Sequence, residues 1–505
     1  MDGPVRHLIG VVVVGILLAW ASPPAAAHAS STVDAHDLDA MLREAQATFR
    51  IPALSVAIVE GDEITYAQGF GATDTAGTVG PETPFIIGSV SKTITALAVA
   101  DLAEQGVIDL AAPVRTYLPW FRLQDETAAA RITVRDLLHH TSGLPESAGV
   151  DLPTGADGSI RTFVERLASV RPVGDVGRTY AYSSANYNVL GAIIEAVTGD
   201  PYGRHIEQTV FQPLDMRTSY TDLAAAQRAG LVRGHTSVFG FPRPVDERVD
   251  PGGVPSGYLV SSSADLARLV RALLNEGRYD GRAVFSPASI QRLQDDVVPT
   301  GSGAAYGLGL FVGTMAGEPA VWHHGGTAGY AASLVLLPRQ RKGFVLLANL
   351  NGTHPVTVTA YQAIRRNLVR SLIGQPTEPV AHARRVSWYV TAAFLVATVS
   401  LLAYLVSVPW WVRRLRWRAR LSVGRHGLPR LVDVALPVTV LLVVPELTGY
   451  SWRVLTTYAP DLAFATLALA GAWLAVGLTK STLVVARLIA SHRQASEPSA
   501  TVGVT

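Results

Sequence analysis

The hydrophobic pattern divides the chain at about residue 377. Before that point apolar positions recur with the short periods of strands and helices, and after it they form long runs. Four short apolar segments bounded by turn residues predict strands: 53–59, 63–70, 331–337 and 343–349. The first two flank Glu60-Gly61-Asp62 and the last two flank the charged turn 338–342, so each pair predicts a hairpin.

Helical periodicity dominates between the two predicted hairpins. Segments with this pattern are 134–139, 160–169, 185–198 and 263–275, and another at 358–373 follows the second hairpin. Strands at both ends with helices between them predict an α+β fold. We expect an antiparallel sheet built from both chain ends, with flanking helices and an inserted helical region, over residues 30–377.

The C-terminal part, residues 378–505, predicts a membrane domain with about three transmembrane helices. Its apolar runs are 388–412, 434–452 and 462–479. The first run carries no charge and is long enough to cross a bilayer. Pro437 and Glu446 interrupt the second run, so a re-entrant second segment is the alternative.

An N-terminal segment, residues 1–29, predicts a signal peptide, with an apolar run at 8–20 and small residues at a cleavage site. The alternative is an uncleaved anchor helix. Either way the 30–377 domain is expected outside the cytoplasm. The arginine-rich stretch 413–430 and the C-terminus then face the cytoplasm, as the positive-inside rule requires. Beside a span, we interpret that stretch as an orientation signal in contact with lipid headgroups, rather than as a nucleic-acid patch.

Composition narrows the possible chemistry. The 42 basic and 40 acidic side chains leave a net charge of +2, so no nucleic-acid partner is expected. The absence of cysteine excludes disulfides, thiolate metal sites and a cysteine nucleophile. The pairs His139-His140 and His323-His324 resemble metal ligands, but adjacent residues on a strand point to opposite faces. We therefore expect no metal site and no cofactor.

Only three of the basic residues are lysines, and one of them stands beside a serine. Lys92 follows Ser89 by three positions in the run FIIGSVSKTITALAVADLAEQG, whose apolar spacing predicts a helix starting near the serine. The two side chains would share a helix face, and a desolvated lysine can activate a hydroxyl. The alternative is an N-cap serine and a solvent-facing lysine. We interpret Lys342 as a solvated turn residue and Lys480 as a residue at the cytoplasmic membrane edge.

Three ordered motifs carry a family resemblance over residues 35–375. They are Ser89-Val90-Ser91-Lys92, Tyr182-Ser183-Ser184 and His323-His324-Gly325. The chain thereby resembles the serine penicillin-recognising superfamily, which includes class C β-lactamases, D-alanyl-D-alanine carboxypeptidases and their esterase and peptidase relatives.

The resemblance implies a role for each motif. Ser89 would attack an acyl carbonyl and form an acyl-enzyme, while Lys92 and Tyr182 act together as the base. The backbone N–H groups of Ser89 and Gly326 would form the oxyanion hole. His323 would stand near the substrate carboxylate or the tyrosine.

Two motif positions depart from the family pattern. Ser184 replaces an asparagine that helps to hold the lysine and a substrate amide, so a gap or a water is expected beside it. His323, two residues before Gly325, replaces the lysine of true β-lactamases. Histidine is only partly charged near neutral pH, which should weaken recognition of a carboxylate. Both changes favour an esterase or peptidase over an antibiotic-hydrolysing enzyme.

The sequence thus predicts a membrane-tethered, extracytoplasmic serine hydrolase acting on an ester or peptide-like substrate. The expected partners are a small-molecule or cell-wall substrate and the lipid bilayer. The alternatives are a β-lactamase or D-alanyl-D-alanine carboxypeptidase, and a sensor that binds penicillin or a wall fragment without turnover.

Overall fold

The computed structural model describes most of the chain between residues 35 and 496. The described ranges are 35–73, 77–150, 158–247, 249–352, 355–380, 428–448 and 451–496, with isolated residues between 392 and 413. The predicted signal peptide lies outside the described residues, as does most of the first predicted span.

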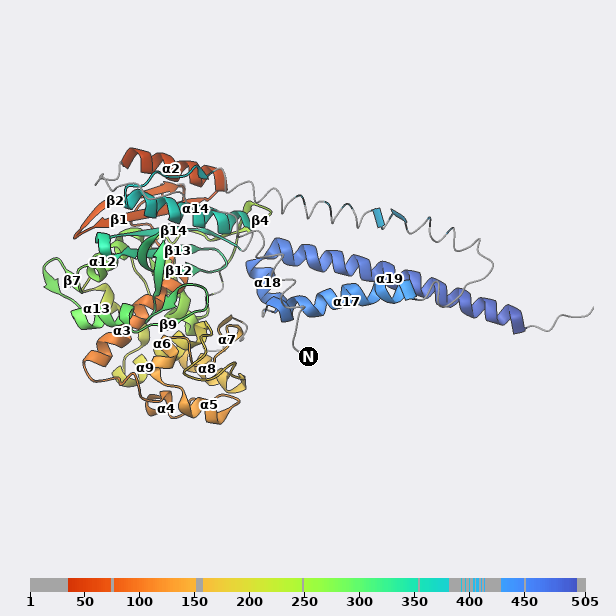
Figure 1. Cartoon of the computed structure of the whole chain (residues 1–505), viewed down its shortest axis with the longest axis horizontal. Helices are drawn as coiled ribbons and strands as arrows, with labels where there is room; N and C mark the ends of the chain where they lie inside the picture. Colours follow the sequence, from red (N-terminus) through yellow and green to blue (C-terminus); the bar gives the residue numbers. More distant parts are fainter. Residues whose placement is uncertain are drawn as a thin grey trace, which may run out of the picture.

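An antiparallel sheet of eight strands forms the centre of the fold, in the order β2-β1-β14-β13-β12-β11-β10-β9. The bounds are β1 (Ala53–Glu60), β2 (Glu63–Gly71), β9 (Val298–Pro299), β10 (Ala305–Tyr306), β11 (Phe311–Met315), β12 (Glu318–Gly326), β13 (Ala331–Leu337) and β14 (Lys342–Ala348). β1 pairs with β14 next to the β2 edge, so strands from the two ends of the 30–377 region lie side by side in one sheet (Figure 1). This confirms the predicted fold class and both hairpins.

Both faces of the sheet are covered, because its strands alternate their buried side chains between two cores. Phe344 and Leu346 of β14 pack on the side of α2 (Ala35–Phe49) and α14 (Pro355–Leu372). Val345 and Leu347 point the other way, toward the larger core that includes α3 (Ser91–Glu104) and α12 (Ser263–Leu274). Burial of each such side chain stabilises the fold by about 1.5–3 kcal/mol.

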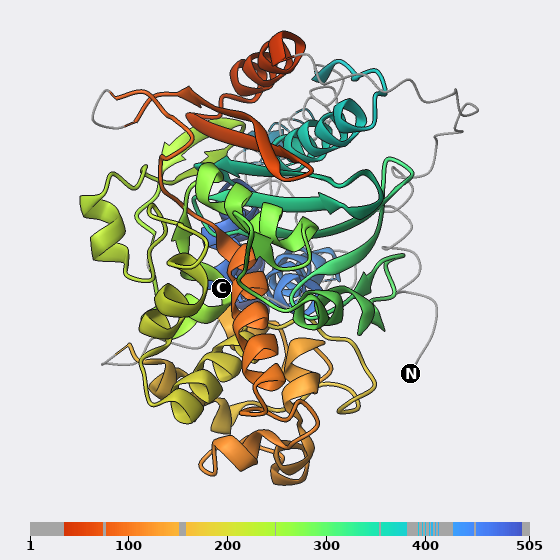
Figure 2. The ribbon, with the colours of Figure 1, turned by 90° about the vertical axis from the view of Figure 1, so that its left-hand side faces the viewer.

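The inserted helical region lies below the sheet in Figure 2, where α3 runs from the sheet into it. Its helices include α4 (Val114–Tyr117), α5 (Glu126–Arg131), α6 (Val134–Leu138), α8 (Ile160–Arg166) and α9 (Ser184–Thr198). The predicted helices are present, with small changes at their ends. A 3₁₀ turn replaces the last residues of the segment predicted at 160–169, and α14 begins three residues before its predicted start.

A small sheet that the sequence did not predict lies beside the main one. Its order is β15-β4-β5, formed by β15 (Leu350–Asn351), β4 (His235–Val238) and β5 (Phe241–Pro244). Asn351 pairs in β15, and its side-chain amide donates to the Thr327 carbonyl at 2.6 Å. The interpretation of Lys342 as a solvated turn residue is wrong. It begins β14, and its ammonium lies 3.0 Å from the Glu60 carboxylate on β1.

The C-terminal part contains α17 (Leu428–Thr448), α18 (Trp452–Tyr458) and α19 (Pro460–Ser496). Within the described residues, one helical segment, 463–486, is long and apolar enough to cross a membrane. Lys480 lies near the C-terminal end of that segment, with its ammonium 4.0 Å from the centre of the Tyr404 ring, and its place at a membrane edge stays a prediction. Three spans remain a prediction. At the other end of α19, the Asp461 carboxylate accepts a hydrogen bond from the Phe239 amide at 3.0 Å, joining α19 to the β4–β5 loop.

Candidate active site

Ser89 and Lys92 meet at the start of α3, as their spacing predicts. Ser89 lies in a 3₁₀ turn, Gly88–Val90, which connects β3 (Phe85–Ile86) to the helix. The Lys92 ammonium Nζ donates to Ser89 Oγ at 2.9 Å and to the Ser256 carbonyl at 2.7 Å. Lys92 is fully buried, which excludes the alternative of a solvent-facing lysine.

Burial changes the protonation of this lysine. It lowers the pKa of Lys92 to about 7, and the nearby Glu146 carboxylate partly opposes that shift. A charged ammonium loses its hydration when it is buried, whereas the neutral amine loses much less. Near neutral pH, a large fraction of Lys92 is therefore a free base within hydrogen-bond distance of a hydroxyl.

On the other side of Ser89, two glycines allow the backbone of its turn to contact the backbone at the end of β12. Gly88 has a φ of +52°, and a Cβ there would lie 2.4 Å from the amide nitrogen of Gly326. A Cβ on Gly325 would lie 2.0 Å from the Ile87 carbonyl oxygen and 3.0 Å from the Ser89 amide nitrogen. The end of β12 and the turn that carries Ser89 can therefore approach this closely only because both positions are glycine.

The pairing of β12 orients the Gly326 amide toward this contact. The Thr327 amide donates to the Tyr330 carbonyl at 3.0 Å across the β12–β13 turn. Successive residues of an antiparallel strand point their amides to opposite sides, so the Gly326 amide points away from β13. β11 pairs with β12 only as far as Trp322, and beyond it the turn holding Ser89 occupies that side. The Ser89 and Gly326 amides thus lie side by side.

A half-buried glutamate fixes the loop that follows Gly326. The Glu247 carboxylate accepts hydrogen bonds from Thr327 Oγ1 at 3.0 Å and from the Gly329 amide at 2.9 Å. Burial raises the pKa of Glu247, and these hydrogen bonds oppose the rise. No local pattern indicates this residue, because its partners lie about eighty positions away along the chain.

The second motif reaches Lys92 through its last serine. Lys92 Nζ donates to Ser184 Oγ at 3.2 Å, so this shorter side chain still reaches the lysine. The gap or water expected beside it stays a prediction. Ser184 begins α9, and a Cβ on Gly149 would lie only 2.7 Å from Ser184 Cβ, which shows how tightly this corner is packed. The Tyr182 ring centre lies 5.1 Å from Lys92 Nζ, so lysine, tyrosine and Ser184 gather around Ser89.

His323 is buried and neutral rather than partly charged. Burial and the charge of Lys92 lower its pKa to about 3. Its Nδ1 lies 2.8 Å from the His324 carbonyl, which can only accept, so Nδ1 carries the proton. Nε2 then accepts from the Tyr306 hydroxyl at 3.2 Å. At neutral pH this imidazole supplies no positive charge to a substrate.

His140 supports the tyrosine motif in a way that the sequence did not predict. Its Nδ1 accepts from the Ser183 amide at 3.1 Å and lies 2.9 Å from Asn186 Nδ2. Its ring centre lies 4.3 Å from that of Tyr182 and 4.8 Å from that of Tyr306. From the sequence, the His139-His140 pair resembled metal ligands only. Within the described residues, no three His, Asp or Glu side chains are grouped closely enough to hold a metal ion.

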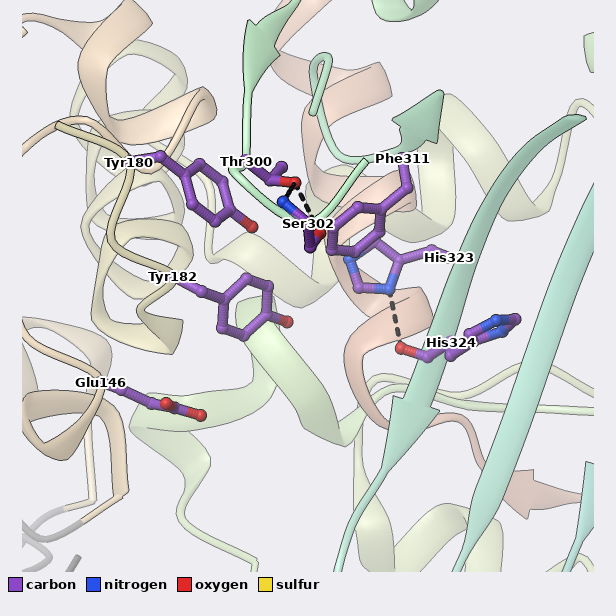
Figure 3. A pocket seen from close by; sticks show the side chains of 8 residues that line it. All are labelled: Glu146, Tyr180, Tyr182, Thr300, Ser302, Phe311, His323 and His324. Carbon is purple, nitrogen blue, oxygen red and sulfur yellow. Dashed lines mark hydrogen bonds between the residues drawn. The ribbon is translucent and has the colours of Figure 1, made fainter. Parts of the chain in front are cut away.

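A pocket of about 430 Å³ opens beside these groups (Figure 3). Its lining residues are Glu146, Tyr180, Tyr182, Thr300, Ser302, Phe311, His323 and His324. In Figure 3, Tyr180, Tyr182 and Glu146 form one side, and Phe311 and the two histidines form the other. The lining contains one carboxylate and neither lysine nor arginine.

Comparison with known proteins identifies the family. The β-lactamase family model matches residues 38–368, and the chain belongs to this family. Penicillin-binding protein 4 of Amycolatopsis lactamdurans is 29% identical over 334 residues, covering 64% of this chain and 86% of that protein. Protein flp of Staphylococcus aureus (strain NCTC 8325 / PS 47) is 26% identical over 433 residues, covering 81% of this chain and 82% of that protein.

Solved structures show the same fold. The octameric penicillin-binding protein homologue from Pyrococcus abyssi superposes with a TM-score of 0.58 and 26% identity, covering 68% of this chain and 78% of that one. EstCE1, described as a hydrolase with promiscuous acyltransferase activity, superposes with a TM-score of 0.53 and 23% identity, covering 63% of this chain and 95% of that one.

Proposed function

We propose that this protein is a serine hydrolase that cleaves an ester or peptide-like substrate through an acyl-enzyme. The observation that carries the proposal is the buried Lys92 amine, 2.9 Å from Ser89 Oγ, with a pKa lowered to about 7. A base whose pKa lies near the working pH is the most effective partner for a hydroxyl nucleophile.

In the first step, Ser89 Oγ forms a bond to the acyl carbon as its proton passes to neutral Lys92. The carbonyl oxygen becomes an oxyanion, which the neighbouring amides of Ser89 and Gly326 stabilise by hydrogen bonds. The bond to the leaving group then breaks, and that group takes the proton. Tyr182, whose ring lies 5.1 Å from Lys92 Nζ, acts with Lys92 in this transfer.

In the second step, water attacks the acyl-enzyme ester and loses its proton to the same base. The carbon–Oγ bond breaks, Ser89 recovers its proton and the acid product leaves. Ser184 Oγ accepts from Lys92 at 3.2 Å and holds the amine in place through both steps.

The pocket favours an ester or an uncharged peptide-like group over a substrate with a fixed carboxylate. Lysine and arginine are the usual partners of a carboxylate, and the lining has neither. His323 stands at the motif position that a lysine holds in true β-lactamases, and it is neutral. A second candidate function is that of a penicillin-reactive peptidase or a sensor of cell-wall fragments. Similarity to penicillin-binding protein 4 supports it.

We place the enzyme at the cell membrane, with residues 30–377 outside the cytoplasm and the C-terminus inside. The support is the N-terminal apolar run, the arginine-rich stretch after the first predicted span, and the apolar segment 463–486. In this location, a cell-wall component is a candidate substrate.

The test is covalent labelling followed by turnover. A fluorophosphonate probe should label the wild type and not Ser89→Ala, with little change in melting temperature between them. Nitrocefin, a short-chain p-nitrophenyl ester and a D-alanyl-D-alanine peptide are then assayed side by side, and we expect the ester to be the best substrate. A correctly folded wild type that takes no label would refute the nucleophile. A penicillin adduct that persists for hours without ester turnover would instead favour the sensor.

A further inference from the structure

The acidic side chain in the pocket is not used by the proposed mechanism. Glu146 is exposed, precedes the short helix α7 (Ser147–Val150), and lies on the pocket side that also carries Tyr180 and Tyr182. Figure 3 shows its carboxylate pointing into the space below the Tyr182 ring. Its charge acts within the site. Burial lowers the pKa of Lys92, and the Glu146 carboxylate opposes that shift. Burial raises the pKa of Tyr180, and the same carboxylate adds to that rise.

The surrounding groups suit a cation. Tyr180 and Tyr182 present aromatic rings, and a cation over such a face is attracted by the π-electron density. Across the pocket, the Thr300 hydroxyl donates to the Ala304 carbonyl at 2.7 Å, so the Ser302 hydroxyl donates to Thr300 and can itself accept from a primary ammonium. Both histidines that complete the lining have lowered pKa values because they are buried, so they do not repel a positive group.

We propose that this pocket recognises substrates that carry an ammonium group, with Glu146 as the counter-charge and Tyr180 and Tyr182 as the aromatic walls. The inference rests on the proposed hydrolase function and names its substrate class. The ammonium can belong either to the acyl part, as in an amino-acid ester, or to the leaving group, as in a choline ester. Both present the same positive charge to the pocket.

The experiment compares each cationic ester with its uncharged isostere, using the full-length protein and titration of the released acid. Alanine ethyl ester against ethyl isobutyrate, in which a methyl group replaces the ammonium, tests a cation on the acyl side. Acetylcholine against 3,3-dimethylbutyl acetate tests a cation on the leaving group. The measured quantity is the ratio of kcat/KM within each pair. Glu146 also changes the pKa of Lys92, but that effect acts on both members of a pair and cancels in the ratio.

We expect the wild type to prefer the cationic member of at least one pair by about tenfold, the combined effect of one ion pair and one cation–π contact. Glu146→Gln should remove most of that preference, and Glu146→Arg should reverse it. The matched control is Glu63→Gln. It changes the net charge equally but lies on β2, the edge strand at the opposite end of the sheet from β9.

The outcomes separate the two proposals. Ser89-dependent turnover of the neutral esters, with ratios unchanged by Glu146→Gln and Glu146→Arg, would overturn the cation site and leave the hydrolase intact. Loss of the preference in Glu63→Gln would also overturn it, because the effect would then be one of net charge. If the wild type hydrolyses none of the four esters, the hydrolase proposal fails and the cation site fails with it.

Discussion

At the residue scale, Lys92 has a role that arginine cannot fill. Its amine donates to Ser89, Ser184 and the Ser256 carbonyl in a fully buried position. Arginine stays protonated at any working pH and cannot accept the serine proton. We expect Lys92→Arg to lower the acylation rate by at least about 10²-fold, near the usual contribution of a general base.

The matched control for this variant is Lys342→Arg on β14, which keeps the ion pair with Glu60 of β1. Acylation is followed with the fluorophosphonate probe, and folding by thermal unfolding. Near wild-type labelling of a folded Lys92→Arg protein would contradict the assignment of Lys92 as the base.

The pKa of Lys92 also sets the pH dependence of the enzyme. The base is the neutral amine, so kcat/KM for an uncharged ester should rise with pH through about 7 and then level off. Glu146 stabilises the ammonium form and so raises this pKa. Its removal in Glu146→Gln should therefore lower the pKa and move the acid limb to lower pH. A pH–rate profile of both proteins checks this, and a shift to higher pH would contradict it.

Local pairs were predictable from the sequence, and distant ones were not. Ser89 and Lys92 stand one helical turn apart, so their contact follows from helix geometry. Ser184 is 92 positions from Lys92 in the chain, and no local pattern encodes that meeting. The neutral state of His323 could not be predicted either, because it depends on burial by segments distant in sequence.

At the element scale, the approach of β12 to the turn at Ser89 depends on glycine. Gly325→Ala would place a Cβ 2.0 Å from the Ile87 carbonyl oxygen, so strand and turn must separate. The Gly326 amide would then move away from the oxyanion. We expect kcat for ester hydrolysis to fall by about 10²-fold, comparable to the loss of one oxyanion donor.

Gly80→Ala is the control for this substitution, because a Cβ at Gly80 has no heavy atom within 4 Å. Both variants are compared by kcat on the ester and by thermal unfolding, which separates a displaced amide from general instability. A Gly325→Ala enzyme with normal kcat would show that the Gly326 amide does not act on the oxyanion.

Elements with a strong period were predictable, and very short ones were not. The β1–β2 and β13–β14 hairpins and the long helices carry enough repeated apolar positions to define them. β9, β10 and β15 have two residues each, which is too few for any periodicity. β15 also pairs in parallel with β4, a partner more than a hundred positions earlier, so only tertiary packing defines it.

At the scale of the whole molecule, the hydrolase core is complete without the C-terminal helices. Among the described residues, both buried clusters draw their members from the region between Leu38 and Val380. The helices beyond instead expose large apolar side chains, including Phe464, Leu478, Val485 and Ile489 of α19. Such side chains suit a lipid environment better than water, which supports a membrane-anchoring role for this part.

This division predicts the result of ending the chain after Val380. The contact from the Phe239 amide to Asp461 is lost, but that contact lies at the β4–β5 loop. The Glu247 hydrogen bonds to Thr327 and Gly329, which fix the loop after Gly326, lie wholly within the hydrolase domain and remain.

We therefore expect the shortened protein, made without residues 1–29, to be soluble without detergent. Its kcat/KM on a short-chain ester should lie within about twofold of the full-length value, because the free-energy change from losing a distant surface contact is a few tenths of a kcal/mol. The full-length protein should need detergent for extraction from membranes. Burial raises the pKa of Tyr458 of α18 to about 12, and the nearby Glu247 carboxylate adds to that rise. A large loss of kcat in a shortened protein that still melts cooperatively would mean that α18 supports the Gly326 loop through Glu247, and that the C-terminal part does more than anchor.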